Sequence, residues 1–198
     1  DKSSVGSGKK KLNEEQQYAV DSLNKAKDGN TVFLLNGITG SGKTEVYLSI
    51  TEWLLKKGKQ VLVLVPEIGL TPQMIVRFEE RIKAKVVAVH SQLNETQKQD
   101  AYLMAKSGEA KVILGTRSAI FTPIPKLGLV IVDEEHDGSF KQQSNFRYSA
   151  RDLSFMRAKL ANIPLILGTA TPSLETLKNV VDQKLTRLVL SSRPGDAI

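Results

Sequence analysis

Apolar and polar residues follow one another along this chain in blocks that predict strands and helices in turn. Short, apolar and largely β-branched runs predict strands at 31–36, 60–65, 86–90, 111–115, 128–132, 164–168 and 186–190. Apolar residues spaced three or four apart predict helices at 14–27, 44–57, 72–83, 95–107, 150–160 and 173–181. The strand runs are continuous, which is typical of strands buried on both faces. This order predicts an α/β fold with a doubly wound, mainly parallel sheet flanked by helices.

The repeating pattern begins at Leu12 and contains no internal repeat or domain break. Residues 1–11 are mostly Ser, Gly and Lys, and they predict a flexible linker or a remnant of an expression vector. Residues 12–198 are therefore expected to form one domain. The longest stretch expected to be irregular is 137–149.

Composition narrows the classes of function. Lys and Arg exceed Asp and Glu by 28 − 21 = 7, and the sequence pI is about 9.5, which favours a polyanionic partner such as nucleic acid over a merely basic surface. The absence of cysteine excludes disulfides, thiolate zinc sites and a cysteine nucleophile within this sequence, and it is compatible with the cytoplasm. No apolar run approaches the ~18 residues of a membrane span, so no membrane association is expected.

Residues 37–44 read G-I-T-G-S-G-K-T and fit the phosphate-loop pattern G-x-x-x-x-G-K-S/T between a predicted strand and a predicted helix. The glycines allow successive N–H groups to point at phosphate oxygens, and the following helix adds its N-terminal dipole. Lys43 would reach the β- and γ-phosphates, and the Thr44 hydroxyl would hold Mg²⁺. The alternative is a glycine-rich turn that contains a lysine by chance. The nucleotide-binding candidates in this loop are Gly37, Thr39, Gly40, Ser41, Gly42, Lys43 and Thr44.

An apolar strand that ends in acidic residues supplies a second half of a nucleotide site. Asp133 directly follows this strand, so it is expected at the carboxyl edge of the sheet, where it would complete the Mg²⁺ shell opposite Thr44. Glu134 would orient and deprotonate an attacking water. The alternative is a solvated acidic turn.

These residues carry a resemblance, because Asp133-Glu134-Glu135-His136 is similar to the D-E-x-H box of superfamily 2 helicases. Further segments resemble the Q motif and motifs Ia, Ib and III of that superfamily, in the expected order: 12–16, 65–68, 115–118 and 169–171. Longer segments resemble the bacterial primosomal replication-restart helicases in particular: 65–73, 115–119, 141–143 and 147–148. The resemblance covers about residues 12–193.

The resemblance implies a RecA-like P-loop NTPase lobe that uses ATP and Mg²⁺. The family activity would be 3′-to-5′ DNA unwinding at stalled replication forks before the replicative helicase is reloaded. The implied partners are single-stranded and forked DNA, primosome proteins and single-strand-binding proteins. The protein itself is expected to be a monomer associated with the bacterial nucleoid. The alternatives are a restriction or recombination translocase, a small-molecule P-loop kinase, and a non-catalytic binding module.

Two parts of the family pattern have no counterpart in this sequence: the second RecA-like lobe with its arginine finger, and the cysteines that bind zinc. The chain is therefore expected to be the first lobe only, and zinc is expected only outside it. Without the second lobe we expect no DNA unwinding and poor hydrolysis.

The resemblance also assigns roles to four further residues. Gln16 would read the adenine edge through its amide, and His136 would bridge toward motif III. Thr169 and Thr171 would couple the nucleotide state to the grip on DNA. The alternatives are a surface helix residue for Gln16 and a cap before Pro172 for the threonines.

Motifs Ia and Ib are expected at strand ends, where N–H groups, hydroxyls and a guanidinium could hold the phosphates of one strand with little sequence preference. The candidates there are Pro66, Glu67, Thr71, Thr116, Arg117 and Ser118. His90 and Ser91 follow another strand and could join them.

The segment 140–148 places aromatic residues among basic and amide residues just after the acidic box. Phe140, Phe146 and Tyr148 could stack on unpaired bases, while Lys141 and Arg147 could take phosphates or couple DNA binding to the nucleotide site. The alternative is a hydrophobic plug that anchors a long loop, with at least one aromatic ring buried.

Overall fold

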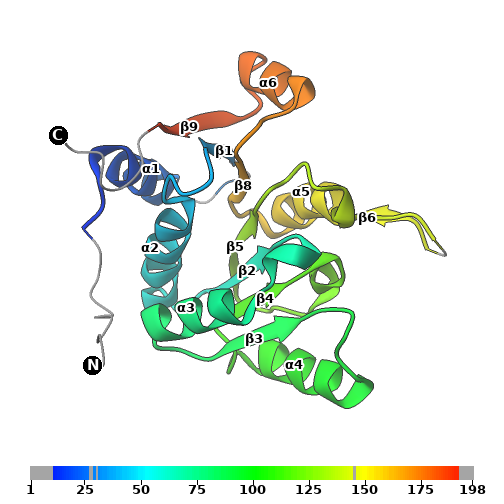
Figure 1. Ribbon diagram of the computed structural model, residues 1–198. Helices are drawn as coiled ribbons and strands as arrows, with labels where there is room; N and C mark the ends of the chain where they lie inside the picture. Colours follow the sequence, from blue (N-terminus) through cyan, green and yellow to red (C-terminus); the bar gives the residue numbers. More distant parts are fainter. Residues whose placement is uncertain (1–10, 27–28, 30, 145, 192–198) are drawn as a thin grey trace, which may run out of the picture.

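A parallel sheet of seven strands forms the centre of the described part of the chain, in the order β3-β4-β2-β5-β8-β1-β9 (Figure 1). The strands are β1 (Val32–Gly37), β2 (Gln60–Leu64), β3 (Val86–Val89), β4 (Val112–Gly115), β5 (Leu127–Val132), β8 (Leu165–Thr169) and β9 (Thr186–Leu190). Each pairing in this sheet is parallel, so the predicted sheet type is confirmed. The computed structural model describes residues 11–26, 29, 31–144 and 146–191, so the expected linker lies outside the described residues except for Lys11.

Helices cover both faces of the sheet (Figure 1). On one face lie α1 (Glu14–Lys25), α2 (Lys43–Lys56) and α3 (Pro72–Ile82), and on the other lie α4 (Glu95–Ser107) and α5 (Ala150–Ala161). α6 (Leu174–Val181) joins β8 to β9 and contacts the second face through Val180. No helix in the described ranges is long and apolar enough to span a membrane.

Successive strand residues face opposite layers, as the continuous apolar runs predicted. In β1, Phe33 and Leu35 belong to the core under α1–α3, whereas Val32 and Leu34 belong to the core under α4 and α5. All four side chains are buried. Two hydrophobic layers on one sheet therefore account for the fold.

The predicted helices and main-sheet strands are confirmed, with ends that differ by at most two residues. α2 begins one residue earlier than predicted, at Lys43, because Gly42 has φ 91° and serves as the N-cap. α1 ends at Lys25, and residue 27, at which the predicted helix ended, lies outside the described residues.

The segment 137–149 is more ordered than predicted. It forms a 3₁₀ turn, η3 (Gly138–Phe140), followed by an antiparallel hairpin of β6 (Lys141–Gln142) and β7 (Tyr148–Ser149). The hairpin projects from the domain beside α5 (Figure 1). Strands of two residues are too short to give a periodic signal, which is why the sequence predicted an irregular stretch.

Candidate functional site

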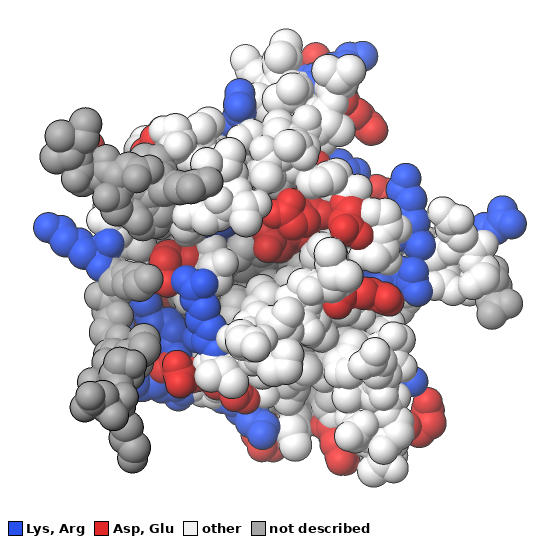
Figure 2. Space-filling view, viewed as in Figure 1, with Lys and Arg blue, Asp and Glu red and all other residues white. Residues whose placement is uncertain are grey.

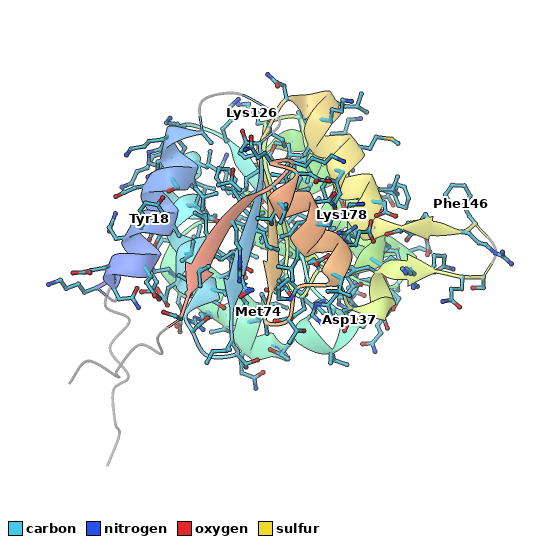
Figure 3. All side chains as sticks on the ribbon, turned by 90° about the horizontal axis from the view of Figure 1, so that it is seen from above. Tyr18, Met74, Lys126, Asp137, Phe146 and Lys178 are labelled. Carbon is cyan, nitrogen blue, oxygen red and sulfur yellow. The ribbon has the colours of Figure 1, made fainter. Side chains whose placement is uncertain are left out.

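Three neighbouring strands, β5, β8 and β1, end at the same edge of the sheet. The acidic residues 133–136, residues 169–171 and the phosphate loop 38–44 lie at or directly after these strand ends. Figure 3 places Asp137 and Met74 at this edge and Lys126 at the opposite one. The carboxyl edge of an open parallel sheet is where ligands of α/β folds bind.

The phosphate loop takes the curled shape that its glycines allow. Gly40 and Gly42 have φ of 84° and 91°, a region that other residues rarely adopt. A Cβ on Gly37 would lie 2.3 Å from Ser41 Oγ, so a glycine is needed where the loop closes on itself. Ser41 Oγ is buried, with no hydrogen-bond partner in the described part of the chain.

Lys43 lies inside this loop and is 8% exposed. Its Nζ donates a hydrogen bond of 2.6 Å to the Gly37 carbonyl and lies 3.6 Å from Glu134 Oε1. The ammonium group is thus held between the loop and the acidic box. In this position its positive charge would stabilise a phosphate group bound by the loop.

A cavity of about 430 Å³ opens beside Lys43, and its size suits a small-molecule ligand. Predicted residues that line it are Gln16, Thr39, Gly40, Gly42, Lys43, Thr44, Asp133 and Glu134. Sequence reasoning missed three other residues of its wall: Lys11, Glu45 and Arg77. Arg77 donates to Glu45 at 2.7 Å from α3, a contact between distant segments that no sequence spacing indicated.

The acidic residues at the end of β5 differ in their environments. Burial raises the pKa of Asp133, while a 2.8 Å hydrogen bond donated by Tyr47 Oη and the charge of Lys43 act in the opposite direction. Burial, followed by the charge of Asp133, raises the pKa of Tyr47 well above its usual value. Glu134 has φ 49°, a left-handed conformation whose cost is often tolerated at functional sites.

Thr44 and Asp133 offer hard oxygen ligands to the same cavity, which suits Mg²⁺ held jointly with the phosphates of a nucleotide. Within the described ranges no group of three or more His, Cys, Asp or Glu side chains could hold a metal ion. Two protein oxygens beside a phosphate loop fit a cation that is also bound by the phosphates of its ligand.

Gln16 is buried, so its interpretation as a surface helix residue is wrong. Its Oε1 accepts a hydrogen bond from the Asn13 N–H at 2.9 Å, and its Nε2 donates to the Gly42 carbonyl at 3.3 Å. The side chain thereby caps α1 and ties this helix to the phosphate loop. Recognition of an adenine edge by Gln16 stays a prediction.

The expected bridge from His136 to motif III is present: His136 Nδ1 lies 3.1 Å from Thr169 Oγ1. Thr169 Oγ1 also accepts a hydrogen bond from the Thr171 N–H at 3.1 Å. The N-cap of the next helix is Ser173, so the threonines do not cap α6. The acidic box and motif III are thus in direct contact.

Glu135, for which sequence reasoning predicted no role, is buried and connects this edge of the sheet to two helices. Its Oε1 accepts a hydrogen bond of 3.1 Å from Thr176 Oγ1 in α6, and its Oε2 pairs with Arg151 Nε in α5. These partners are distant in sequence, so the pattern around the box carried no signal for them.

A second cavity, of about 250 Å³, brings together motif Ia, motif Ib and the hairpin. Its lining residues are Glu67, Ser91, Thr116, Arg117, Ser118, Gln142, Phe146 and Tyr148. Phe146 is 73% exposed and lies at the outer end of the hairpin (Figure 3). Tyr148 makes an edge contact with the exposed Phe121, with ring centroids 5.0 Å apart.

Four of the predicted nucleic-acid contacts have a structural role in this conformation. Phe140 is 1% exposed in the core under α5, so its expected stacking on bases is wrong, and the plug interpretation holds for this ring. Arg117 donates to the carbonyls of Ser139 and Lys141, at 3.2 and 3.1 Å, and so fastens the hairpin. The Thr71 hydroxyl caps α3, and Pro66 is buried.

Basic side chains do not form one continuous stripe on the face drawn in Figure 2. Lys and Arg gather over α2 and α3 and again beside the hairpin, while acidic side chains occupy the middle of the view. The excess of Lys and Arg over Asp and Glu therefore does not by itself identify the surface that would bind nucleic acid.

Comparison with known proteins places this arrangement in a family. Residues 9–174 match the family described as "Type III restriction enzyme, res subunit". The chain is 50% identical over 186 residues to Replication restart protein PriA of Haemophilus influenzae, covering 94% of this chain and 25% of that protein. It is 56% identical over 148 residues to PriA of Synechocystis sp., covering 74% of this chain and 18% of that protein.

The fold is similar to that of RecG in its structure with a three-way DNA junction, with a TM-score of 0.67 and 21% identity. That match covers 94% of this chain and 25% of RecG, and it supports the predicted RecA-like α/β fold. The chain belongs to the family described as "Type III restriction enzyme, res subunit", and it is similar over most of its length to about a quarter or less of the PriA replication restart proteins.

Proposed function

We propose that this chain is the ATP-binding lobe of a 3′-to-5′ DNA helicase that acts in replication restart. The observation that carries the proposal is the position of Lys43 Nζ, 3.6 Å from Glu134 Oε1, in a cavity that also holds Thr44 and Asp133. A phosphate cradle, two oxygen ligands for a cation and the further carboxylate of Glu134 converge there, as ATP hydrolysis by water requires. We propose that residues 12–198 form this lobe.

In the proposed site the loop N–H groups and Lys43 bind the phosphates of ATP, and Thr44 and Asp133 hold Mg²⁺. The cation would neutralise charge on the β- and γ-phosphates when bound. Glu134 orients the attacking water and accepts its proton. His136 relays the state of this site to motif III through its 3.1 Å contact with Thr169.

The second cavity is the proposed contact with single-stranded or forked DNA. Its hydroxyls and backbone N–H groups would hold phosphates, and Phe146 and Tyr148 would stack on unpaired bases. Glu67 also lines this cavity, and its carboxylate repels phosphates. We therefore give Glu67 a role in coupling rather than in attraction.

Two rival functions have weaker support. The family description names a restriction enzyme, which fits a restriction or recombination translocase, but the relatives reported above are both replication restart proteins. A small-molecule kinase would need an acceptor site beside the phosphates, whereas the adjacent carboxylates of Asp133 and Glu134 in this cavity suit hydrolysis by water. Primosome and single-strand-binding proteins as partners, zinc elsewhere in a longer protein, and a place at the nucleoid all rest on the likeness to PriA.

Strand separation on a forked DNA tests the proposal. A protein of the relatives' full length should separate the strands only with ATP and Mg²⁺, and should release the γ-phosphate as inorganic phosphate. The 198-residue chain alone should separate none, because strand movement needs a second lobe to open and close against it. Transfer of the γ-phosphate to a small acceptor would support the kinase instead.

Arg147→Ala in the full-length protein is expected to keep the melting temperature and the basal ATPase rate but to lose most of the stimulation by DNA. Arg147 is exposed on the hairpin, so its removal costs little packing. Its guanidinium would hold a phosphate next to the stacked bases. The measurement is the ATPase rate against the concentration of single-stranded DNA.

Arg187→Ala is the matched control, because Arg187 is an exposed arginine that does not line the second cavity. It lies on β9, the edge strand at the end of the sheet opposite to β3 and β4. It should respond to DNA like the parent. If Arg147→Ala also keeps full stimulation, or simply unfolds, the coupling role of the hairpin is wrong and the structural interpretation replaces it.

A further inference from the structure

Tyr47 is a fully buried tyrosine whose hydroxyl faces the acidic box. It lies on α2 one turn after Lys43, and its Oη donates a hydrogen bond of 2.8 Å to Asp133 Oδ1. Residues four apart lie on the same side of a helix, so the helix that begins with Lys43 also holds the carboxylate of Asp133, which directly follows β5. A buried tyrosine hydroxyl without a hydrogen-bond partner would destabilise the fold, so buried tyrosines usually have such a partner.

Gly168 on β8 provides the space in which this contact forms. A Cβ at this position would lie 1.8 Å from Tyr47 Oη and 2.7 Å from Asp133 Oδ1. β8 runs between β5 and β1, so any side chain there would separate α2 from the end of β5. Residues of α2 and β8, together with Asp133 after β5, therefore meet at this one hydrogen bond.

We infer that Tyr47 is a positioning residue for Asp133, which holds the carboxylate in one orientation before Mg²⁺ arrives with the nucleotide. This inference rests on the proposed function of the site. A carboxylate already oriented by a partner outside the metal shell binds its cation without reorganisation, and loss of such a partner weakens metal binding. Tyr47 itself touches neither nucleotide nor cation in this role.

The alternative is that Tyr47 only fills the core, where it is among the largest fully buried side chains. Tyr47→Phe separates the two roles, because it keeps the ring and removes only the hydroxyl. If packing is all that matters, Tyr47→Phe should not change the dependence on Mg²⁺. If positioning matters, the dependence on Mg²⁺ should change while binding in the absence of the cation does not.

The test is binding of a non-hydrolysable ATP analogue to the 198-residue chain, titrated with Mg²⁺ and repeated in EDTA. Tyr47→Phe is expected to raise the half-saturating Mg²⁺ concentration about tenfold, the size expected for one hydrogen bond to a charged group. Affinity in EDTA should equal that of the parent. Tyr18→Phe removes the same atom from an exposed tyrosine on α1 and should change neither value.

A parent chain whose binding ignores Mg²⁺ would contradict the proposed function itself. A parent that responds to Mg²⁺ and a Tyr47→Phe variant that responds identically would overturn the inference alone. Should Tyr47→Phe fold poorly, Gly168→Ala alone takes its place in the Mg²⁺ titration, because its methyl group crowds the contact between Tyr47 Oη and Asp133 Oδ1, and an unchanged half-saturating Mg²⁺ concentration would overturn the inference. Where Tyr47→Phe folds, thermal melting adds a second measurement.

Gly168→Ala should lower the melting temperature, because its methyl group meets Tyr47 Oη. The double variant Gly168→Ala/Tyr47→Phe should recover part of that loss, since the nearest ring atom, Tyr47 Cζ, is 3.1 Å from the added Cβ. Melting temperatures that are equal for the single and double variants would show that the hydroxyl does not occupy this space, and the inference would fall.

Discussion

Glu134→Gln is expected to lower the rate of ATP hydrolysis by about 10²–10⁴-fold while ATP still binds. The amide keeps the shape of the carboxylate but cannot accept a proton from the attacking water. Glutamine meets the same backbone demand as glutamate at φ 49°, so the turn after β5 should be kept. The measurements are single-turnover hydrolysis by the full-length protein and equilibrium binding of ATP.

Glu175→Gln is a suitable control, because Glu175 is exposed on the first turn of α6 and lines neither cavity. It should hydrolyse ATP like the parent. Unchanged turnover in Glu134→Gln would remove Glu134 as the base. Loss of ATP binding would indicate instead that the carboxylate has a structural role in the cavity.

Lys43→Ala is expected to weaken ATP binding strongly and to lower hydrolysis by about 10²–10³-fold, because the site loses the charge that stabilises the phosphates. The melting temperature should stay close to that of the parent. The polar contacts of the Lys43 ammonium in the described part of the chain are with the Gly37 carbonyl and Glu134, and neither belongs to the hydrophobic core. Calorimetric titration with an ATP analogue and thermal melting measure the two effects separately.

Lys56→Ala is the matched control, since Lys56 is an exposed lysine in the last turn of the same helix. It removes the same charge far from the loop and should leave binding unchanged. Normal ATP binding by Lys43→Ala would mean that residues 37–44 are a glycine-rich turn and not a phosphate site.

The sequence predicted most of the fold because its signals are local. Runs such as 128–132 are apolar throughout, and both faces of β5 are indeed buried. The phosphate loop could be read from glycine positions alone, since Gly40 and Gly42 adopt the conformations that only glycine takes readily. Likewise, a strand followed directly by Asp133 predicted that the acidic box lies at the carboxyl edge of the sheet.

The rest could not be predicted, because it depends on contacts between distant segments. Tyr47 and Asp133 are 86 residues apart, and Glu135 and Thr176 are 41 apart, so no spacing rule connects them. The aromatic segment shows the same limit. Phe140 and Phe146 have similar sequence surroundings, yet one is in the core and the other is exposed. The 3₁₀ turn η3 ends with Phe140 and places its ring in the core under α5, whereas Phe146 lies on the projecting hairpin.

We propose that this lobe binds ATP in a cycle that DNA controls, and the ATPase rate of the full-length protein with and without forked DNA is the measurement that tests it. We expect slow turnover without DNA and a several-fold or greater rise as forked or single-stranded DNA is added. Both the turnover and the rise should be lost in Lys43→Ala and in Glu134→Gln. A rate that is the same with and without DNA, or turnover that survives both substitutions, would contradict it.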